Sequence, residues 1–150
     1  MDNIALAITA IITTLLFIVL AGQLAVLRVQ REMDGKINGT LTLTLLGLIP
    51  LVAHKISNLT GAIVVFDPNN EKACDVELLT ADKSCRMQNV YFGKRVHHEK
   101  IVERITGYIN HPNGVLSVIN PPLAQFILRI SIPVIMFIAS ITWLIVLIIR

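Results

Sequence analysis

The fold is decided first by residues 4–27, IALAITAIITTLLFIVLAGQLAVL, which contain 24 residues and no charged side chain. At about 1.5 Å of rise per residue, a helix of this length measures about 36 Å and crosses a bilayer with some tilt. A cleaved signal peptide is the alternative, but it needs a basic segment ahead of the apolar one, and only Asp2 and Asn3 follow Met1 here. The stretch therefore predicts a retained transmembrane helix.

A second apolar segment lies at residues 130–149, ISIPVIMFIASITWLIVLII, and it also lacks charged residues. Its 20 residues form about 30 Å of helix, again enough to cross a bilayer. Arg129 and Arg150 flank the segment as basic anchors, and Pro133 lies in the first turn, where a helix tolerates proline best. We therefore expect a transmembrane helix over residues 123–149.

A third apolar segment, INGTLTLTLLGLIPLVA at residues 37–53, has 17 uncharged residues, the short end of the range for a span. Threonines alternate with leucines in its first half, which is typical of a strand. A lone strand cannot cross a bilayer, because its backbone groups would have no hydrogen-bond partners there. The segment therefore predicts a short transmembrane helix, with a re-entrant or interfacial segment and a buried core helix as alternatives.

The expected fold class is thus a mainly α membrane protein with three transmembrane helices, two of them firm and the one at 37–53 uncertain. Residues 28–36 form a loop, and residues 54–122 form a small α/β domain outside the bilayer. Within that domain, a helix is predicted over residues 96–109, with Arg95 and Glu99 spaced as i,i+4 partners. Short strands are predicted at 62–66, 74–79, 89–92 and 115–119.

Basic residues predict the orientation. Arg28, Arg31 and Lys36 follow the first span in one short loop, whereas Asp2 is the only charged side chain before that span. The positive-inside rule places this loop in the cytoplasm and the N-terminus outside. Three spans then put the domain outside and the C-terminus in the cytoplasm, whereas two spans would put the whole middle of the chain in the cytoplasm.

The chain has two cysteines, Cys74 and Cys85, both in the polar middle. A pair in one small domain predicts a disulfide, which persists in oxidising compartments and is worth about 3 kcal/mol in the chain-entropy model. This disulfide favours the three-span topology. Two unpaired thiols are the alternative.

Small residues recur along the first helix, and they predict a face that packs against protein. Small side chains let helices approach closely within lipid, where packing drives association. The heptad spacing and the pair Ala21-xxx-Ala25 define this face, whose members are Ala7, Ala10, Thr14, Ala21 and Ala25.

The sequence predicts no catalytic, metal-binding or cofactor-binding site. His97 and His98 point about 100° apart on a helix and lack an i,i+4 histidine partner, so they predict a solvated helix face with Glu99 and Glu103 rather than a metal site. The two cysteines do not form a CxxC motif, and no cofactor motif occurs. The sequons at Asn38 and Asn58 are read as chance matches.

Composition agrees with a membrane protein that does not bind nucleic acid. Apolar residues make up 54% of the chain and charged residues 15%, against about 25% in soluble proteins. Mean hydropathy is +0.70. The net charge of +3 is small, its basic residues are mixed with acidic ones, and aromatic residues make up only 5%, so neither a basic stripe nor a base-stacking surface is expected.

The sequence therefore predicts a non-catalytic structural or accessory subunit of a multi-subunit membrane complex. Its partners would be other membrane subunits, in a hetero- or homo-oligomer, and the lipid bilayer. A membrane-permeabilising protein is the alternative, because three spans with this orientation resemble one class of holin. That resemblance covers topology only, and the polar loop here is longer than holin loops usually are. A membrane enzyme ranks last.

Overall fold

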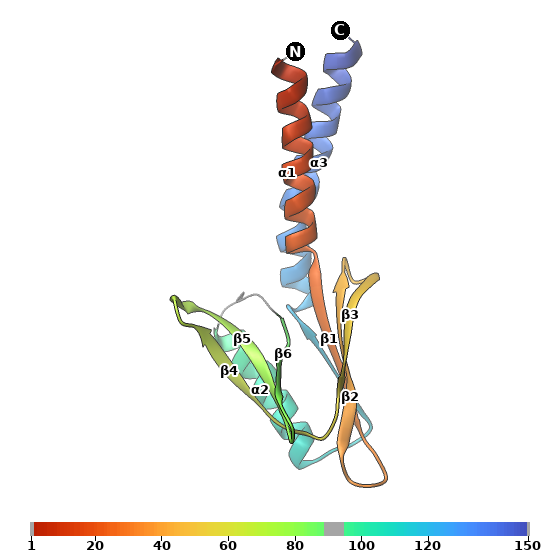
Figure 1. The fold of residues 1–150 in the computed structure, drawn as a ribbon, viewed down its shortest axis with the longest axis vertical. Helices are drawn as coiled ribbons and strands as arrows, with labels where there is room; N and C mark the ends of the chain where they lie inside the picture. Colours follow the sequence, from red (N-terminus) through yellow and green to blue (C-terminus); the bar gives the residue numbers. More distant parts are fainter. Residues whose placement is uncertain (1, 89–94, 150) are drawn as a thin grey trace.

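A pair of long helices stands on a β-rich domain (Figure 1). The computed structural model describes residues 2–88 and 95–149, and in those residues it contains three helices and seven strands. Helices α1 (Asp2–Ala21) and α3 (Leu123–Ile149) lie side by side, and the rest of the described chain forms the domain at one end of the pair. Both ends of the chain lie at the opposite end of the pair.

The first sheet follows directly from α1 and leads directly into α3. Its strands are antiparallel and lie in the order β3-β2-β1-β7, so the central strands β2 and β1 each have two partners. The strand bounds are β1 Gln23–Arg31, β2 Ile37–Leu45, β3 Ile49–Ile56 and β7 Val115–Asn120.

The second sheet has the antiparallel order β4-β5-β6, and helix α2 (Arg95–Asn110) packs on β4 and β5. Its strands are β4 Leu59–Asp67, β5 Asn70–Thr80 and β6 Ser84–Arg86. One hydrophobic core joins both sheets and the helix. Fully buried side chains from four different elements meet in it, for example Leu27, Leu41, Val76 and Ile105.

The prediction of a mainly α fold with three transmembrane helices is wrong. The described part of the chain is a mixed α/β structure, and residues 37–53 form the hairpin of β2 and β3 instead of a helix. The alternation of threonine and leucine was the correct signal, since Leu41 is buried and Thr40 is exposed. The objection to a lone strand does not apply, because β1 pairs with the whole length of β2.

Strand β1 accounts for a second difference from the prediction. Helix α1 ends at Ala21, and the apolar residues after it belong to the sheet, with Leu24 and Leu27 buried. Gly22 permits this change of direction: a Cβ at Gly22 would lie 2.6 Å from the carbonyl oxygen of Ile18 and 2.8 Å from Cδ2 of Leu46. A continuous apolar run does not by itself distinguish a helix from a buried strand. The prediction that the first helix continues to Leu27 is therefore wrong.

The predicted elements of the middle region are found with longer bounds. The run at 62–66 lies in β4, 74–79 in β5, 115–119 in β7 and 96–109 in α2. The predicted pair is formed, with Arg95 Nε 2.6 Å from Glu99 Oε1. The strand predicted at residues 89–92 lies outside the described residues.

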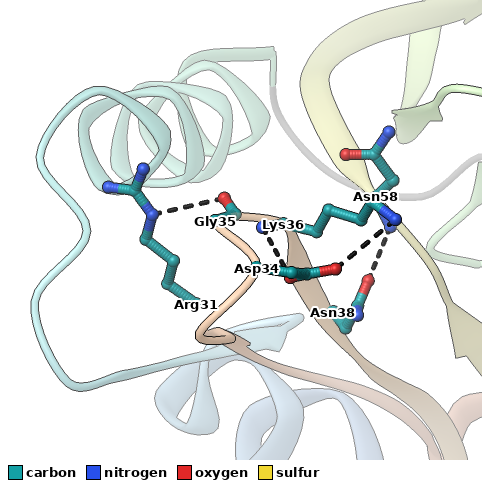
Figure 2. A network of polar contacts seen from close by, with 6 residues as sticks. All are labelled: Arg31, Asp34, Gly35, Lys36, Asn38 and Asn58. Carbon is teal, nitrogen blue, oxygen red and sulfur yellow. Dashed lines mark hydrogen bonds and ion pairs between the residues drawn. The ribbon is translucent and has the colours of Figure 1, made fainter.

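Polar contacts close the turns at the end of the domain away from the long helices, as Figure 2 shows. In the β1–β2 turn, Asp34 accepts a hydrogen bond from the backbone N–H of Lys36 at 3.0 Å, and its other oxygen lies 3.4 Å from Nζ of Lys36. Asn38 on β2 accepts a hydrogen bond from the backbone N–H of Asn58 at 2.8 Å. This contact holds the connection between β3 and β4 against β2, and Asn38 takes part through its side chain whereas Asn58 takes part through its backbone.

Within the described part of the chain, two helices are long and apolar enough to cross a membrane, residues Asn3–Ala21 of α1 and Leu123–Ile149 of α3. Only 11% and 0% of the residues in their most apolar windows are buried, so neither is the core helix of a soluble fold. Two crossing helices would place both ends of the chain on one side of a membrane, whereas the predicted orientation placed them on opposite sides.

Candidate functional site

A cluster of buried side chains that can form hydrogen bonds lies inside the domain. It draws on both sheets and on α2, and its members are Cys74, Asp75, Gln88, His98 and Asn120. Asn120 ends β7 three residues before α3 begins. The fold brings the cluster together because α2 turns the residues at positions 98, 101, 105 and 108 toward the sheet, spaced three or four apart.

Cys74 and His98 form the chemically most distinctive pair in the described chain. Sγ of Cys74 lies 3.1 Å from Nδ1 of His98, and the two residues are 0% and 1% exposed. Burial raises the pKa of the Cys74 thiol, and the nearby carboxylates Asp75 and Glu99 raise it further. Burial also lowers the pKa of His98. Both groups are therefore held neutral, which is the opposite of an activated thiolate.

The histidines differ from their predicted setting on a solvated helix face. His98 is buried against Cys74, while His97 lines a shallow surface hollow with Lys100 and Arg104. The sequence contains a signal for this, because His98 lies three and seven positions before the apolar residues Ile101 and Ile105, a spacing that places all three on one face of a helix. The two imidazole rings lie 6.0 Å apart and tilted by 60°, so they do not converge on one point.

Asp75 connects the second sheet to β7 through Gln88. Its Oδ1 accepts a hydrogen bond from the N–H of Val76 at 2.7 Å, and its Oδ2 accepts one from the N–H of Gln88 at 3.0 Å. Nε2 of Gln88 in turn donates to the carbonyl oxygen of Asn120 at 2.7 Å. Burial raises the pKa of Asp75 to about 6, although the two backbone hydrogen bonds act in the opposite direction.

This carboxyl makes stability depend on pH. Folded Asp75 binds its proton at about pH 6 and the unfolded group at about 3.8, so the contribution of Asp75 to stability rises as pH falls between these values. The difference corresponds to about 3 kcal/mol. We expect wild type to gain up to about that amount over Asp75→Asn between pH 7 and pH 4, measured by urea unfolding in detergent. His98 contributes equally to both proteins, and parallel pH curves would contradict the assignment.

No arrangement of ligands for a metal ion is found in residues 2–88 and 95–149. The Cys74–His98 pair comes nearest to such an arrangement of ligands, but it supplies only two ligand atoms, both in the protein core. A structural zinc site takes four. The cluster as described joins elements of the domain rather than presenting reactive groups to solvent.

The predicted disulfide between Cys74 and Cys85 is not formed. Cys85 on β6 pairs with Leu78 on β5, four residues along that strand from Cys74. Four residues of strand span about 13 Å, whereas the Cα atoms of a disulfide lie at most about 7 Å apart. The register of the sheet therefore excludes the bridge and removes the support it gave to a domain outside the cytoplasm.

The predicted packing face is divided between two elements. On α1, Ala7 and Thr14 are buried, and Ala10 and Ala21 are partly buried. The partner of this helix within the chain is α3. Ala25 is also buried, but it belongs to β1 and lies in the core of the domain.

An apolar groove of about 650 Å³ runs between the two long helices. Most of its polar side chains are hydroxyls, and three of these donate to carbonyls of their own helix: Thr9 to Ala5 at 2.9 Å, Thr14 to Ala10 at 2.8 Å and Ser140 to Met136 at 2.8 Å. The groove is lined by Leu6, Thr9, Ala10, Thr13, Thr14 and Phe17 of α1, and by Ile132, Pro133, Met136, Ser140 and Trp143 of α3.

Comparison of the chain with models of known protein families, with curated proteins and with solved structures finds no match. Its role is therefore inferred from its own geometry and chemistry.

Proposed function

We propose that the chain is a membrane-anchored accessory subunit that acts through contacts. Helices α1 and α3 cross the bilayer together as a hairpin and hold the β-rich domain at one membrane surface. The groove between them receives a transmembrane helix of a neighbouring subunit. The groove carries the proposal, because its lining combines small side chains with hydroxyls that are already bonded to their own helices.

Such a lining is typical of helix interfaces in membranes. Small residues let backbones approach closely, and these hydroxyls can still accept a hydrogen bond where a partner offers a donor. The groove contains no ionisable residue, so it is a poor path for ions or protons. The buried neutral Cys74–His98 pair is likewise a poor nucleophile, which favours a subunit that supports an assembly over one that catalyses a reaction.

We propose that the domain lies on the cytoplasmic side of the membrane. Arg28, Arg31 and Lys36 follow soon after α1, whereas Asp2, the first residue of α1, is the only charged side chain before its apolar stretch. This asymmetry is the positive-inside pattern for a two-helix hairpin. Two cysteines that the sheet register keeps apart also suit a reducing compartment.

Filling the groove tests the proposal. Ala10→Leu together with Ser140→Leu adds bulk inside it, so we expect the particle that mild detergent extracts from native membranes to shrink from an assembly to the single chain of 16.6 kDa. Ala5→Leu together with Ala139→Leu is the matched control, because both alanines are exposed and neither lines the groove.

Native mass spectrometry measures the mass of the extracted particle. A control that keeps the wild-type mass while the groove variant loses it supports the proposal. A wild type that is already a single chain, or a groove variant that keeps its partners, contradicts it; a lipid alone would then occupy the groove.

A further inference from the structure

The tip of the β2–β3 hairpin carries the largest apolar side chains that the domain exposes next to the long helices. Leu46, Leu48 and Ile49 are 37%, 83% and 55% exposed, and Gly47 completes the turn between them. We call these four residues the apolar tip. The first charged residues on either side of it are Lys36 and Lys55, which lie at the far ends of the two strands.

The apolar tip is level with the point where the helices leave the domain. The N–H of Leu46 donates to the carbonyl oxygen of Gly22 at 2.7 Å, one residue after α1 ends. A Cβ at Gly22 would meet both Cδ2 of Leu46 at 2.8 Å and Cδ1 of Ile130 at 3.3 Å, so the tip, α1 and α3 converge there. Figure 1 shows the same arrangement, with the hairpin ending beside the lower end of α1.

The backbone of the tip is held in an unfavourable conformation. Leu46 has a φ of 57°, in the left-handed region that leucine rarely adopts, and Gly47 follows with a φ of 71°. This conformation leaves the side chain of Leu46 against the helix pair and turns that of Leu48 outward. Two backbone N–H groups of the tip are already bonded, that of Leu46 to Gly22 and that of Leu48 to Leu45 at 3.1 Å.

We propose that the apolar tip inserts into the lipid bilayer beside α1 and α3, as a third membrane contact that does not cross. This inference rests on the proposed crossing by the two helices. The boundary of the bilayer then falls near Gly22 and Ile130, because α1 contributes 20 residues before Gly22 and α3 contributes 20 from Ile130 to Ile149, each enough for about 30 Å. Arg129 precedes this boundary on α3, as basic residues at a membrane surface commonly do.

Lipid is the occupant that the surroundings favour. The apolar surface of the tip is continuous with that of the helices, so a bilayer that surrounds the helices also reaches the tip. Leu46 and Leu48 have bonded N–H groups, which reduces the penalty for bringing them into an apolar medium. A hairpin anchored in this way fixes the tilt of the first sheet relative to the membrane.

A single tryptophan probe distinguishes lipid from its alternatives. The full chain is placed in phosphatidylcholine vesicles whose acyl chains are brominated near the glycerol end, which quenches indole emission by contact. In a Trp143→Phe background, Leu48→Trp reports on the tip. Met33→Trp is the matched control, because Met33 is a fully exposed residue in the β1–β2 turn, at the other end of the same sheet. Ile49→Trp provides a second position should Leu48→Trp fold poorly.

The expected result is strong bromolipid quenching, with emission at shorter wavelength, for Leu48→Trp, and no quenching for Met33→Trp. Equal access of aqueous iodide to both positions would overturn the inference. Protection from iodide without bromolipid quenching would also overturn it, since a protein surface would then cover the tip. Trp143, the only tryptophan of the wild type, reports separately on α3: if it is quenched and Leu48→Trp is not, the tip inference fails while the crossing stands.

Discussion

Placing a charge in the middle of each long helix is expected to release the chain from the membrane. Ile12 and Ile138 lie near the midpoints of the two apolar segments and are 62% and 58% exposed. An arginine at the centre of a transmembrane helix costs about 3 kcal/mol. The double variant Ile12→Arg, Ile138→Arg should therefore lose most of the alkali-resistant membrane fraction that wild type retains.

The matched control places the same two charges on the domain. Met33 in the β1–β2 turn and Val115 on β7 are exposed, and arginine at both should leave the membrane fraction unchanged. If the helices were instead exposed to water, arginines at Ile12 and Ile138 would be harmless surface changes. An alkali-resistant fraction equal to that of wild type would therefore contradict membrane crossing.

Substitution of Gly39 by alanine is expected to destabilise the domain by about 3 kcal/mol, the upper end of the usual cost of overpacking, because the atoms it would meet belong to the backbone. Gly39 lies on β2 opposite Val29 of β1. A Cβ at this position would overlap the carbonyl oxygen of Arg28 and would lie 2.7 Å from Cα of Val29. These atoms have little room to shift, because β1 is paired on its other side with β7.

Gly107→Ala is the control for Gly39→Ala. Gly107 lies within α2, and apart from its chain neighbours and the backbone of its own helix no atom is within 4 Å of the Cβ that alanine would add. Alanine is favoured over glycine in a helix by about 1 kcal/mol, so this variant should be slightly more stable than wild type. Urea unfolding of both variants in detergent measures the difference. An unfolding midpoint for Gly39→Ala equal to that of wild type would contradict the close approach of β1 and β2.

The sequence predicted the local elements better than their assembly. Alternation and turn residues located β4, β5 and β7, and the helical period located α2, because these patterns act over a few neighbouring residues. The β2–β3 hairpin was missed because its pairing with β1 depends on residues that were assigned to a longer first helix. Apolar composition alone does not distinguish a strand in a sheet from a short span.

The candidate sites could be predicted only in part. Ala7, Ala10, Thr14 and Ala21 lie on the least exposed side of α1, because helical spacing fixes which residues share a face. The contact between Cys74 and His98 joins residues 24 positions apart through the packing of α2 on β5, and no local motif marks it. The disulfide predicted between Cys74 and Cys85 is not formed for a related reason, because nearness in sequence does not determine strand register.

In the proposed topology, α1 and α3 cross the bilayer as a hairpin, with both ends on one side and the domain on the other. Protease protection in sealed vesicles of known orientation tests it, with an epitope tag added at each end of the full chain. When the cytoplasmic face is outward, trypsin should cut the domain at exposed basic residues such as Arg31 and Lys36, and both tags should remain protected. When that face is inward, both tags should be lost and the domain should stay intact. One tag protected and the other digested in the same vesicles would contradict the two-helix hairpin.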